Sequence, residues 1–292
     1  MEHRSYKLRG TTDCPIAVYG ISKPVIFSHW HPEVELLMVT RGTLHCHLEN
    51  RNVTLSAGQI LILNPNQLHG VQSYDENMRY INVIFSVEAI AMPPTHIFQR
   101  NFVGPLADGR LQLPNFLHPD HPAYETVSTA MLQMRKGDLY LDESKLFRYT
   151  QVVAICAALQ PHCTLTQAED RRQSPEDRTV RKAMIYMHNL YARPLTLKGI
   201  AQHVNLQPNH LCTVFKAYTG HTVMEHLAQT RVDAAKFLLR RDSLPMARVA
   251  ELSGFPSERT FFRQFQKVAG MTPKNYQKQQ RMAGLTESPE TL

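Results

Sequence analysis

The sequence predicts an α+β protein: an N-terminal antiparallel β-barrel with two following helices, and then an all-α domain that contains two helix–turn–helix units. Short apolar runs separated by Gly, Pro and Asn turns fill residues 15–90, which is typical of a small antiparallel barrel or sandwich. The apolar spacing changes to the helical period from Ala123 onward. Near the C-terminus one pattern of Ala, Phe and Gly occurs twice, at Ala201, Phe215 and Gly220 and again at Ala250, Phe265 and Gly270.

Four apolar runs predict strands of the barrel: Val34–Val39, Leu44–Leu48, Gln59–Leu63 and Tyr80–Phe85. The first run ends before the turn signal Arg41-Gly42, and the third stops at Asn64-Pro65-Asn66. The second run alternates in the manner of a pleated strand. Residues 91–120 are rich in Pro, Phe and His, and we expect them to be irregular.

Two amphipathic helices are predicted after the barrel, and they could pack on it or on another copy of the chain. The apolar positions are Val127, Ala130, Met131 and Met134 in the first helix, and Leu146, Tyr149, Val152, Val153, Cys156 and Leu159 in the second. The polar stretch 164–178 is the predicted linker between a domain at 1–163 and a helical domain at 179–284. Residues 285–292 are expected to be a flexible tail.

Charge is unevenly distributed along the chain. Residues 179–292 contain 16 Lys and Arg against 7 Asp and Glu, whereas residues 1–178 contain 16 against 18. A basic C-terminal part favours a polyanion as partner, and an ordinary solvated basic surface is the alternative. The five cysteines form no CxxC pair, so neither a disulfide framework nor a zinc site is expected from them.

The location of the protein is predicted from features that the sequence lacks. No segment approaches the roughly 18 continuous apolar residues of a membrane span. Residues 1–10 are polar and charged and lack the apolar core of a secretion signal. We therefore expect a soluble, cytoplasmic protein without a membrane partner.

The helical domain is predicted in some detail. The expected helices are Thr179–Tyr191, Leu197–Val204 with Thr196 as its cap, Pro208–Tyr218, Val223–Leu239, Met246–Ser253 and Ser257–Ala269. In each repeated unit a small residue, Ala201 or Ala250, allows two helices to cross closely. Asn205 and Gly254 supply the turn, where a positive φ is needed.

The second helix of each unit has an apolar face and a polar face. The apolar positions are Leu211, Val214, Phe215 and Tyr218 in one unit and Phe261, Phe265 and Val268 in the other, and they are expected to be core. The polar faces contain Asn209, Thr213 and Lys216, with Gln207 at the entrance, and Arg259, Arg263 and Lys267. Arg can bind guanine in a bidentate manner and Asn can bind adenine. The lysines suit phosphates, which position a protein without specifying sequence.

These residues lead to a specific resemblance. The stretches concerned are Leu206–Gly220, Arg231–Leu239, Val249-Ala250, Gly254-Phe255, Phe261–Phe265 and Gly270–Pro273 with Tyr276. Residues 179–278 resemble the DNA-binding domain of the AraC/XylS family of bacterial transcription regulators. The resemblance implies a rigid seven-helix domain whose recognition helices enter adjacent major-groove segments about 34 Å apart on one face of the DNA. It also implies contact with RNA polymerase.

Three positions depart from the family pattern. Thr213 stands where the family often has Arg, so base reading by the first unit would be weaker. Phe262 stands where a small polar residue is usual, at a position that faces DNA in the resemblance. It could contact a thymine methyl group or deepen the core. Gln266 replaces a common Lys and would remove one phosphate contact.

A histidine-rich motif marks the N-terminal domain. His29, His31 and Glu35 match the spacing HxH-x3-E, Gly42 follows, and His69 lies further along. The first three share parity, so one strand could direct all of them into a barrel interior. The motif resembles the cupin barrel, and residues 15–90 resemble the effector-binding domain common in AraC-type regulators.

Three interpretations of this motif remain open. Three imidazoles and a carboxylate could bind a divalent transition metal. They could instead form hydrogen bonds to a small polar effector such as a sugar, or be core polar groups satisfied internally. Contact with an organic effector is favoured, without a cofactor.

The resulting hypothesis is a homodimeric transcription regulator that binds promoter DNA under the control of a small polar effector. It would activate genes of carbohydrate or related catabolism. The alternatives are a metal-dependent cupin enzyme with an accessory DNA-binding domain, and a constitutive DNA binder with a vestigial barrel.

Overall fold

The computed structural model describes residues 14–21, 25–72, 75, 77–135, 142–166, 174–241 and 244–286. The chain divides into two compact units, Met1–Gln173 and Ser174–Leu292, and each is described by itself. Residues 1–13 and residues 287–292 of the predicted tail 285–292 lie outside the described residues.

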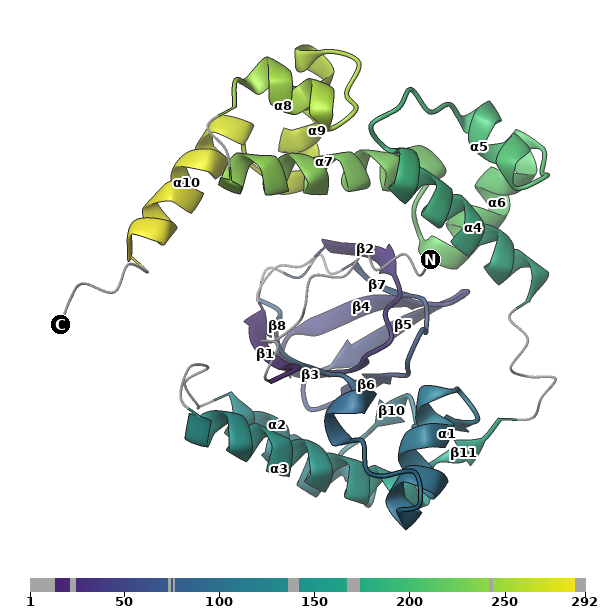
Figure 1. Ribbon diagram of the computed structural model, residues 1–292, viewed down its shortest axis with the longest axis vertical. Helices are drawn as coiled ribbons and strands as arrows, with labels where there is room; N and C mark the ends of the chain where they lie inside the picture. Colours follow the sequence, from purple (N-terminus) through teal and green to yellow (C-terminus); the bar gives the residue numbers. More distant parts are fainter. Residues whose placement is uncertain are drawn as a thin grey trace. The chain divides into compact units, whose positions relative to one another are not determined.

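The first unit is built on antiparallel strands, as predicted (Figure 1). The strands are β1 (Ile16–Ile21), β2 (Val25–His29), β3 (Val34–Arg41), β4 (Thr43–Leu48), β5 (Arg51–Ser56), β6 (Ile60–Leu63), β7 (His69–Gln72), β8 (Arg79–Phe85), β9 (Leu111–Gln112), β10 (Phe116–Leu117) and β11 (Thr164–Leu165). One sheet has the order β1-β8-β3-β6-β10 and a second has the order β2-β7-β4-β5. Strand β9 pairs with β11.

The helical segments of this unit follow the strands. They are η1 (Val87–Ile90), η2 (Gln99–Val103), α1 (Gly104–Ala107), α2 (Tyr124–Met134), α3 (Asp142–Leu159) and η3 (Gln160–His162). Helices α2 and α3 lie side by side along one sheet in Figure 1.

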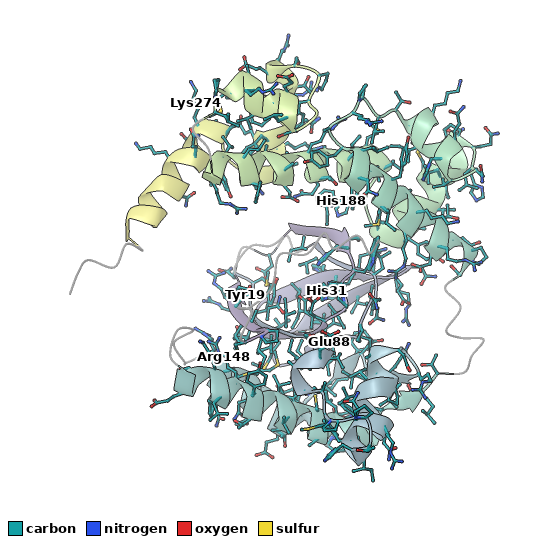
Figure 2. The ribbon with its side chains drawn as sticks, in the orientation of Figure 1. Tyr19, His31, Glu88, Arg148, His188 and Lys274 are labelled. Atoms are coloured by element: carbon teal, nitrogen blue, oxygen red, sulfur yellow. The ribbon has the colours of Figure 1, made fainter. Side chains whose placement is uncertain are left out.

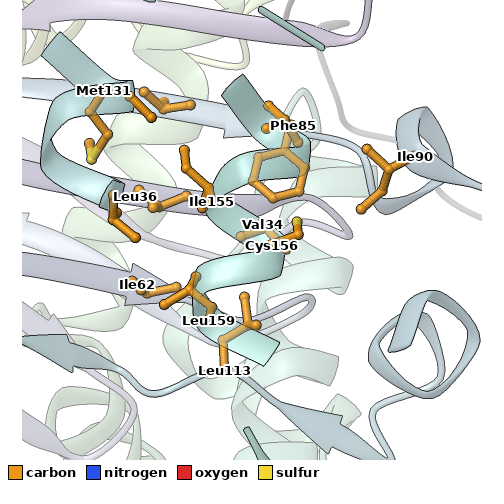
Figure 3. Close-up of a cluster of buried hydrophobic side chains, with 14 of the residues drawn as sticks. Val34, Leu36, Ile62, Phe85, Ile90, Leu113, Met131, Ile155, Cys156 and Leu159 are labelled. Carbon is orange, nitrogen blue, oxygen red and sulfur yellow. The ribbon is translucent and has the colours of Figure 1, made fainter. Parts of the chain in front are cut away.

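Alternation along the strands divides the apolar residues of this unit into two cores. Leu37 and Val39 face the second sheet, where Leu44 and Leu55 pack against them. Residues on the opposite face of β3, Val34 and Leu36, belong to a core with Met131 of α2 and with Ile155 and Leu159 of α3 (Figure 3). Each fully buried Leu or Ile stabilises the fold by about 1.5–3 kcal/mol relative to its exposed state.

Residues 91–120 are not uniformly irregular, which corrects the expectation from composition. Phe102, Val103 and Leu106 are buried by the consecutive turns of η2 and α1. Leu117 of β10 pairs with Ile60 of β6. Apolar residues spaced along a Pro-rich segment therefore extend the core even though the segment has no clear period.

The predicted linker is shorter than residues 164–178. At one end Thr164 pairs with Gln112 in the β9–β11 ribbon. At the other end α4 begins at Pro175, because the Ser174 Oγ accepts a hydrogen bond from the amide of Asp177 at 3.0 Å and Pro suits the first turn. The helix predicted from Thr179 thus begins one turn earlier. Residues 167–173 lie outside the described part of the chain.

The second unit consists of helices in its described residues (Figure 1). They are α4 (Pro175–Leu190), α5 (Leu197–His203), α6 (Pro208–Thr219), α7 (Val223–Arg241), α8 (Met246–Leu252), α9 (Glu258–Ala269) and α10 (Pro273–Thr286). The long α7 packs against α4 and α6 and also against α8, α9 and α10. Thr196 caps α5 as predicted, and Gly220 and Gly270 end α6 and α9 in the left-handed conformation.

Candidate nucleic-acid interface and barrel site

The two predicted helix–turn–helix units have the same backbone geometry. In the α5–α6 unit the amide of Leu206 donates to the carbonyl oxygen of Ala201 at 2.9 Å, and Asn205 has φ 57°. In the α8–α9 unit the amide of Phe255 donates to the carbonyl oxygen of Ala250 at 2.9 Å, and Gly254 has φ 77°. The sequence repeat is therefore a repeat of one hydrogen-bonded turn.

Both second helices turn their predicted apolar face inward. Leu211 and Phe215 of α6 are fully buried, as are Phe261 and Phe265 of α9. The α9 rings meet edge to face, with centroids 5.6 Å apart, a geometry favoured by aromatic pairs. This burial fixes the rotation of each helix and hence the direction of its polar side chains.

The predicted polar faces are exposed. Asn209, Thr213 and Lys216 lie along α6 at helical spacing, with Gln207 before the helix. Arg259, Arg263 and Lys267 lie along α9. Residues four apart on a helix share one face, so each helix presents a continuous row of polar side chains away from its core.

Three positions on these faces have distinct surroundings. The Thr213 hydroxyl donates to the carbonyl oxygen of Asn209 at 3.1 Å, within its own helix. The Nζ of Lys267 lies 3.6 Å from Glu225 Oε1 at the start of α7. Phe262 is half-buried and packs against the core of the α8–α9 unit. The ring of Phe262 therefore contributes to the core, and its partial burial leaves the rest of the side chain exposed.

Contacts that the loop between α4 and α5 makes with α7 and with the second helix–turn–helix unit were not predicted from the sequence. Arg231, on α7, donates from Nε to the carbonyl oxygen of Tyr191 at 2.9 Å and from Nη2 to that of Arg193 at 3.0 Å. A Cβ at Gly254 would lie 2.2 Å from the Tyr191 carbonyl oxygen and 2.7 Å from the Ala192 Cα. The loop between α4 and α5 is thus held between α7 and the turn of the second unit.

The four predicted barrel residues converge in the first unit. One ligand atom from each of His29, His31, Glu35 and His69 lies within 4.8 Å of the others. His29 and His69 are cross-strand partners in β2 and β7, and Glu35 lies on β3. The expectation of a single strand is wrong, because β2 ends at His29 and β3 begins at Val34.

Hydrogen bonds hold this cluster in place. The His31 Nε2 lies 2.7 Å from Glu35 Oε2, and the His69 Nε2 lies 3.3 Å from the same oxygen. The amide of Asn82 donates from Nδ2 to Glu35 Oε1 at 2.8 Å. The rings of His29 and His69 are 4.4 Å apart between centroids. Figure 2 shows His31 among the strands of the first unit.

The electrostatics of Glu35 follow from these contacts. Burial by itself raises the pKa of this carboxyl group, but the hydrogen bonds and charges of His31 and His69 outweigh burial and hold the pKa well below its ordinary value. Glu35 is therefore an anion in a nearly water-free site, since only 3% of its surface is exposed.

Two residues that support the cluster were missed in the sequence. Asn82 is an isolated amide among the buried residues that follow Arg79 in β8, and that isolation was an available signal. Glu33 Oε2 lies 3.3 Å from His31 Nδ1. Glu33 lies in the turn before β3, and its role depends on the direction of the His31 ring, which a strand pattern does not predict.

The fold and the two sites together define a class of protein: a barrel with a buried polar cluster joined to a double helix–turn–helix domain. A family model described as an AraC-like ligand binding domain matches residues 17–147, and one described as a helix-turn-helix domain matches residues 200–279. The chain belongs to the AraC/XylS family of DNA-binding transcription regulators.

Relatives extend over different parts of the chain. The HTH-type transcriptional activator RhaR of Cronobacter sakazakii is 25% identical over 265 residues, which cover 87% of this chain and 88% of RhaR. The arabinose operon regulatory protein of Escherichia coli is 31% identical over 133 residues, 44% of this chain and 45% of that protein. A solved structure of ToxT from Vibrio cholerae is 14% identical, with a TM-score of 0.45 over 90% of this chain and 97% of that chain.

The matching families and relatives are regulators of transcription rather than enzymes. No helix in the described residues has the length and apolar character that crossing a membrane requires.

Proposed function

We propose that this chain is an effector-controlled activator of carbohydrate or related catabolic genes, acting on promoter DNA in the bacterial cytoplasm. The single observation that carries the DNA-binding part is the pair of exposed polar faces on α6 and α9, each set by a buried face behind it. The names of two relatives, the activator RhaR and the arabinose operon regulatory protein, support activation and sugar-related targets.

The proposed roles on DNA follow the chemistry of the side chains. Arg259, Arg263 and Asn209 would bind base edges, while Lys216 and Lys267 would bind phosphates. Gln207 and Thr213 would contribute polar contacts, and the part of Phe262 outside the core would contact a thymine methyl group. Because Lys267 lies near Glu225, its phosphate contact would be weaker than that of Lys216.

The proposed effector site is the cluster of His29, His31, Glu35 and His69. Effector binding there would reposition the N-terminal arm, about residues 1–14, or the dimer interface. This would shift a pre-existing equilibrium between two arrangements of the dimer. RNA polymerase would be the partner in activation.

A transcription reporter tests this function. The reporter carries the DNA upstream of the gene for this protein, in a strain with and without the full chain, and a panel of sugars is added. We expect one sugar or a related polar compound to raise transcription only when the protein is present. Promoter binding and transcription that are unchanged by every compound would favour the constitutive alternative.

A second copy of the chain is the proposed partner of α3. Leu146, Thr150, Val153 and Ala157 recur at helical spacing on the exposed side of this helix. Leu146 is 67% exposed and Val153 is 43% exposed. An uncharged and mostly apolar row of this kind can be buried by the same row of another copy, in a two-fold interface.

Val153→Glu is expected to weaken dimerisation about tenfold or more, because a charge would replace an apolar contact in the interface. Sedimentation of the full chain over a range of concentrations measures the effect. Gln133→Glu is the control, since it adds the same charge to an exposed site on the neighbouring α2. Equal dimerisation of wild type and Val153→Glu would exclude α3 as the interface.

A further inference from the structure

We propose that His29, His31, Glu35 and His69 bind one divalent first-row transition metal ion inside the barrel. The inference deepens the proposed function, since it concerns the site assigned to the effector. It is based on the directions in which the four side chains are held.

The donor set suits such an ion. Imidazole nitrogen and carboxylate oxygen are ligands of Zn²⁺, Fe²⁺, Ni²⁺ and Mn²⁺. The four ligand atoms lie within 4.8 Å of one another, whereas opposite ligands about 2.1 Å from an ion would be about 4.2 Å apart. Side-chain movements of a few tenths of an ångström would therefore close the site around a metal.

The outer nitrogen of each histidine faces an oxygen that can only accept a hydrogen bond. The Nδ1 of His29 lies 3.0 Å from the Phe27 carbonyl oxygen, and the Nδ1 of His69 lies 2.8 Å from the Gln67 carbonyl oxygen. The Nδ1 of His31 lies 3.3 Å from the carboxylate of Glu33. Each of these oxygens can hold a ring proton on Nδ1, so Nε2 is the nitrogen that each histidine would offer to a metal ion.

Glu35 is oriented in a corresponding way. Its Oε1 accepts from Asn82, while its Oε2 faces the Nε2 atoms of His31 and His69. A metal ion at the centre of the cluster would bind both His31 Nε2 and Glu35 Oε2 in place of the hydrogen bond between them. The Asn82 amide and the oxygens behind the rings would keep these ligands in position.

Four protein ligands leave further positions on an ion that prefers five or six ligands. Hydroxyl or carboxylate oxygens of a polar effector could occupy them. The metal would then be the part of the site that selects oxygen-rich molecules over apolar ones.

The test measures metal binding by the full-length, untagged chain. Protein treated with a chelator and dialysed is titrated with Zn²⁺ by calorimetry and with Co²⁺ by visible absorption, and bound metal is counted by mass spectrometry. The variants are His69→Ala and Glu35→Gln, of which the second keeps the size of the side chain. His45→Ala is the matched control, because His45 is exposed on β4 and outside the cluster.

We expect one metal ion per chain for wild type and His45→Ala, with visible Co²⁺ bands typical of nitrogen and oxygen ligands. Affinity should fall by more than about tenfold in both cluster variants, since even changes behind the ligands cost 10- to 100-fold. Wild type that takes up no stoichiometric metal, or Glu35→Gln that binds as tightly as wild type, would overturn the proposal.

Circular dichroism and DNA binding of each variant show whether it is folded. An absence of metal in protein that still responds to an effector would overturn the metal site and leave the proposed function standing. The opposite outcome is a protein that binds stoichiometric metal, loses it in both cluster variants and binds no DNA. That outcome would support the metal site and contradict the proposed function.

Discussion

Gly254→Ala is expected to destabilise the helical unit by about 3 kcal/mol and to weaken DNA binding with it. Two costs combine at this position. The left-handed backbone, with φ 77°, costs a residue with a side chain about 1–2 kcal/mol. The new Cβ would also lie 2.2 Å from the Tyr191 carbonyl oxygen, and such overpacking costs about 1–3 kcal/mol.

Gly270→Ala separates these two costs. Gly270 has nearly the same backbone, with φ 71°, but among the described residues no heavy atom beyond its chain neighbours would lie within 4 Å of a Cβ at this position. This variant should lose only about 1 kcal/mol. Urea unfolding of the full chain, followed by the helical circular dichroism signal, measures both variants. With a slope of about 2 kcal/mol per molar urea, Gly254→Ala should lower the midpoint by about 1.5 M.

Equal losses in the two glycine variants would mean that the approach of Tyr191 to the α8–α9 turn is relaxed at no cost. The loop between α4 and α5 would then not link the two helix–turn–helix units. The relative position of α6 and α9 would in that case depend on α7 alone.

Arg263→Ala is expected to cost about 1–3 kcal/mol of binding to the preferred DNA site and to relax the preference at one base position. The reason is geometric: the side chain is exposed in the middle of the row on α9, behind which Phe261 and Phe265 are buried. A guanidinium there can bind a guanine through two hydrogen bonds, and its loss leaves those base groups unpaired.

Lys216→Ala provides the contrast. As a phosphate contact it should weaken binding to all sequences alike and reduce the dependence of log affinity on log salt by about one unit. The DNA affinity of both protein variants is measured at several salt concentrations. The DNA is a site selected for binding to the wild-type protein, together with a set of its single-base variants. If Arg263→Ala weakened binding to every sequence equally, Arg263 would contact the backbone rather than a base.

The helical unit could be predicted closely because its information is local. Apolar spacing placed Phe215 and Phe265 in the core, and the need for a positive φ identified Asn205 and Gly254 as turns. Caps such as Thr196 lie within three residues of the amides that they bind. The pattern misplaced the start of α4, where Ser174 caps the helix ahead of its first apolar residue, and it missed helix α10.

The barrel could be predicted only in part. The apolar strands β3, β6 and β8 stand out in the sequence, but β5 does not, because Leu55 alone of its residues is buried. Strand β7 is short and begins at a histidine. Pattern identifies strands that supply core residues, and it misses strands that complete a sheet mainly through backbone hydrogen bonds.

Partners distant in the chain were beyond prediction. Asn82 and Glu35 are 47 residues apart, and Arg231 and Tyr191 are 40 apart. Periodicity indicates which face of an element a side chain occupies, whereas its partner depends on how elements pack. The gathering of His29, His31, Glu35 and His69 was foreseen from motif spacing, but the acceptors that orient the three rings were not.

Chemical footprinting of the full chain on its selected promoter site tests the central claim that α6 and α9 present two DNA-binding faces. Each protein copy should protect two major-groove segments on one side of the duplex, about 10 base pairs apart. Arg263→Ala should reduce protection and base preference in one segment while the other persists. A single protected segment per copy, or two segments that respond equally to Arg263→Ala, would contradict the account.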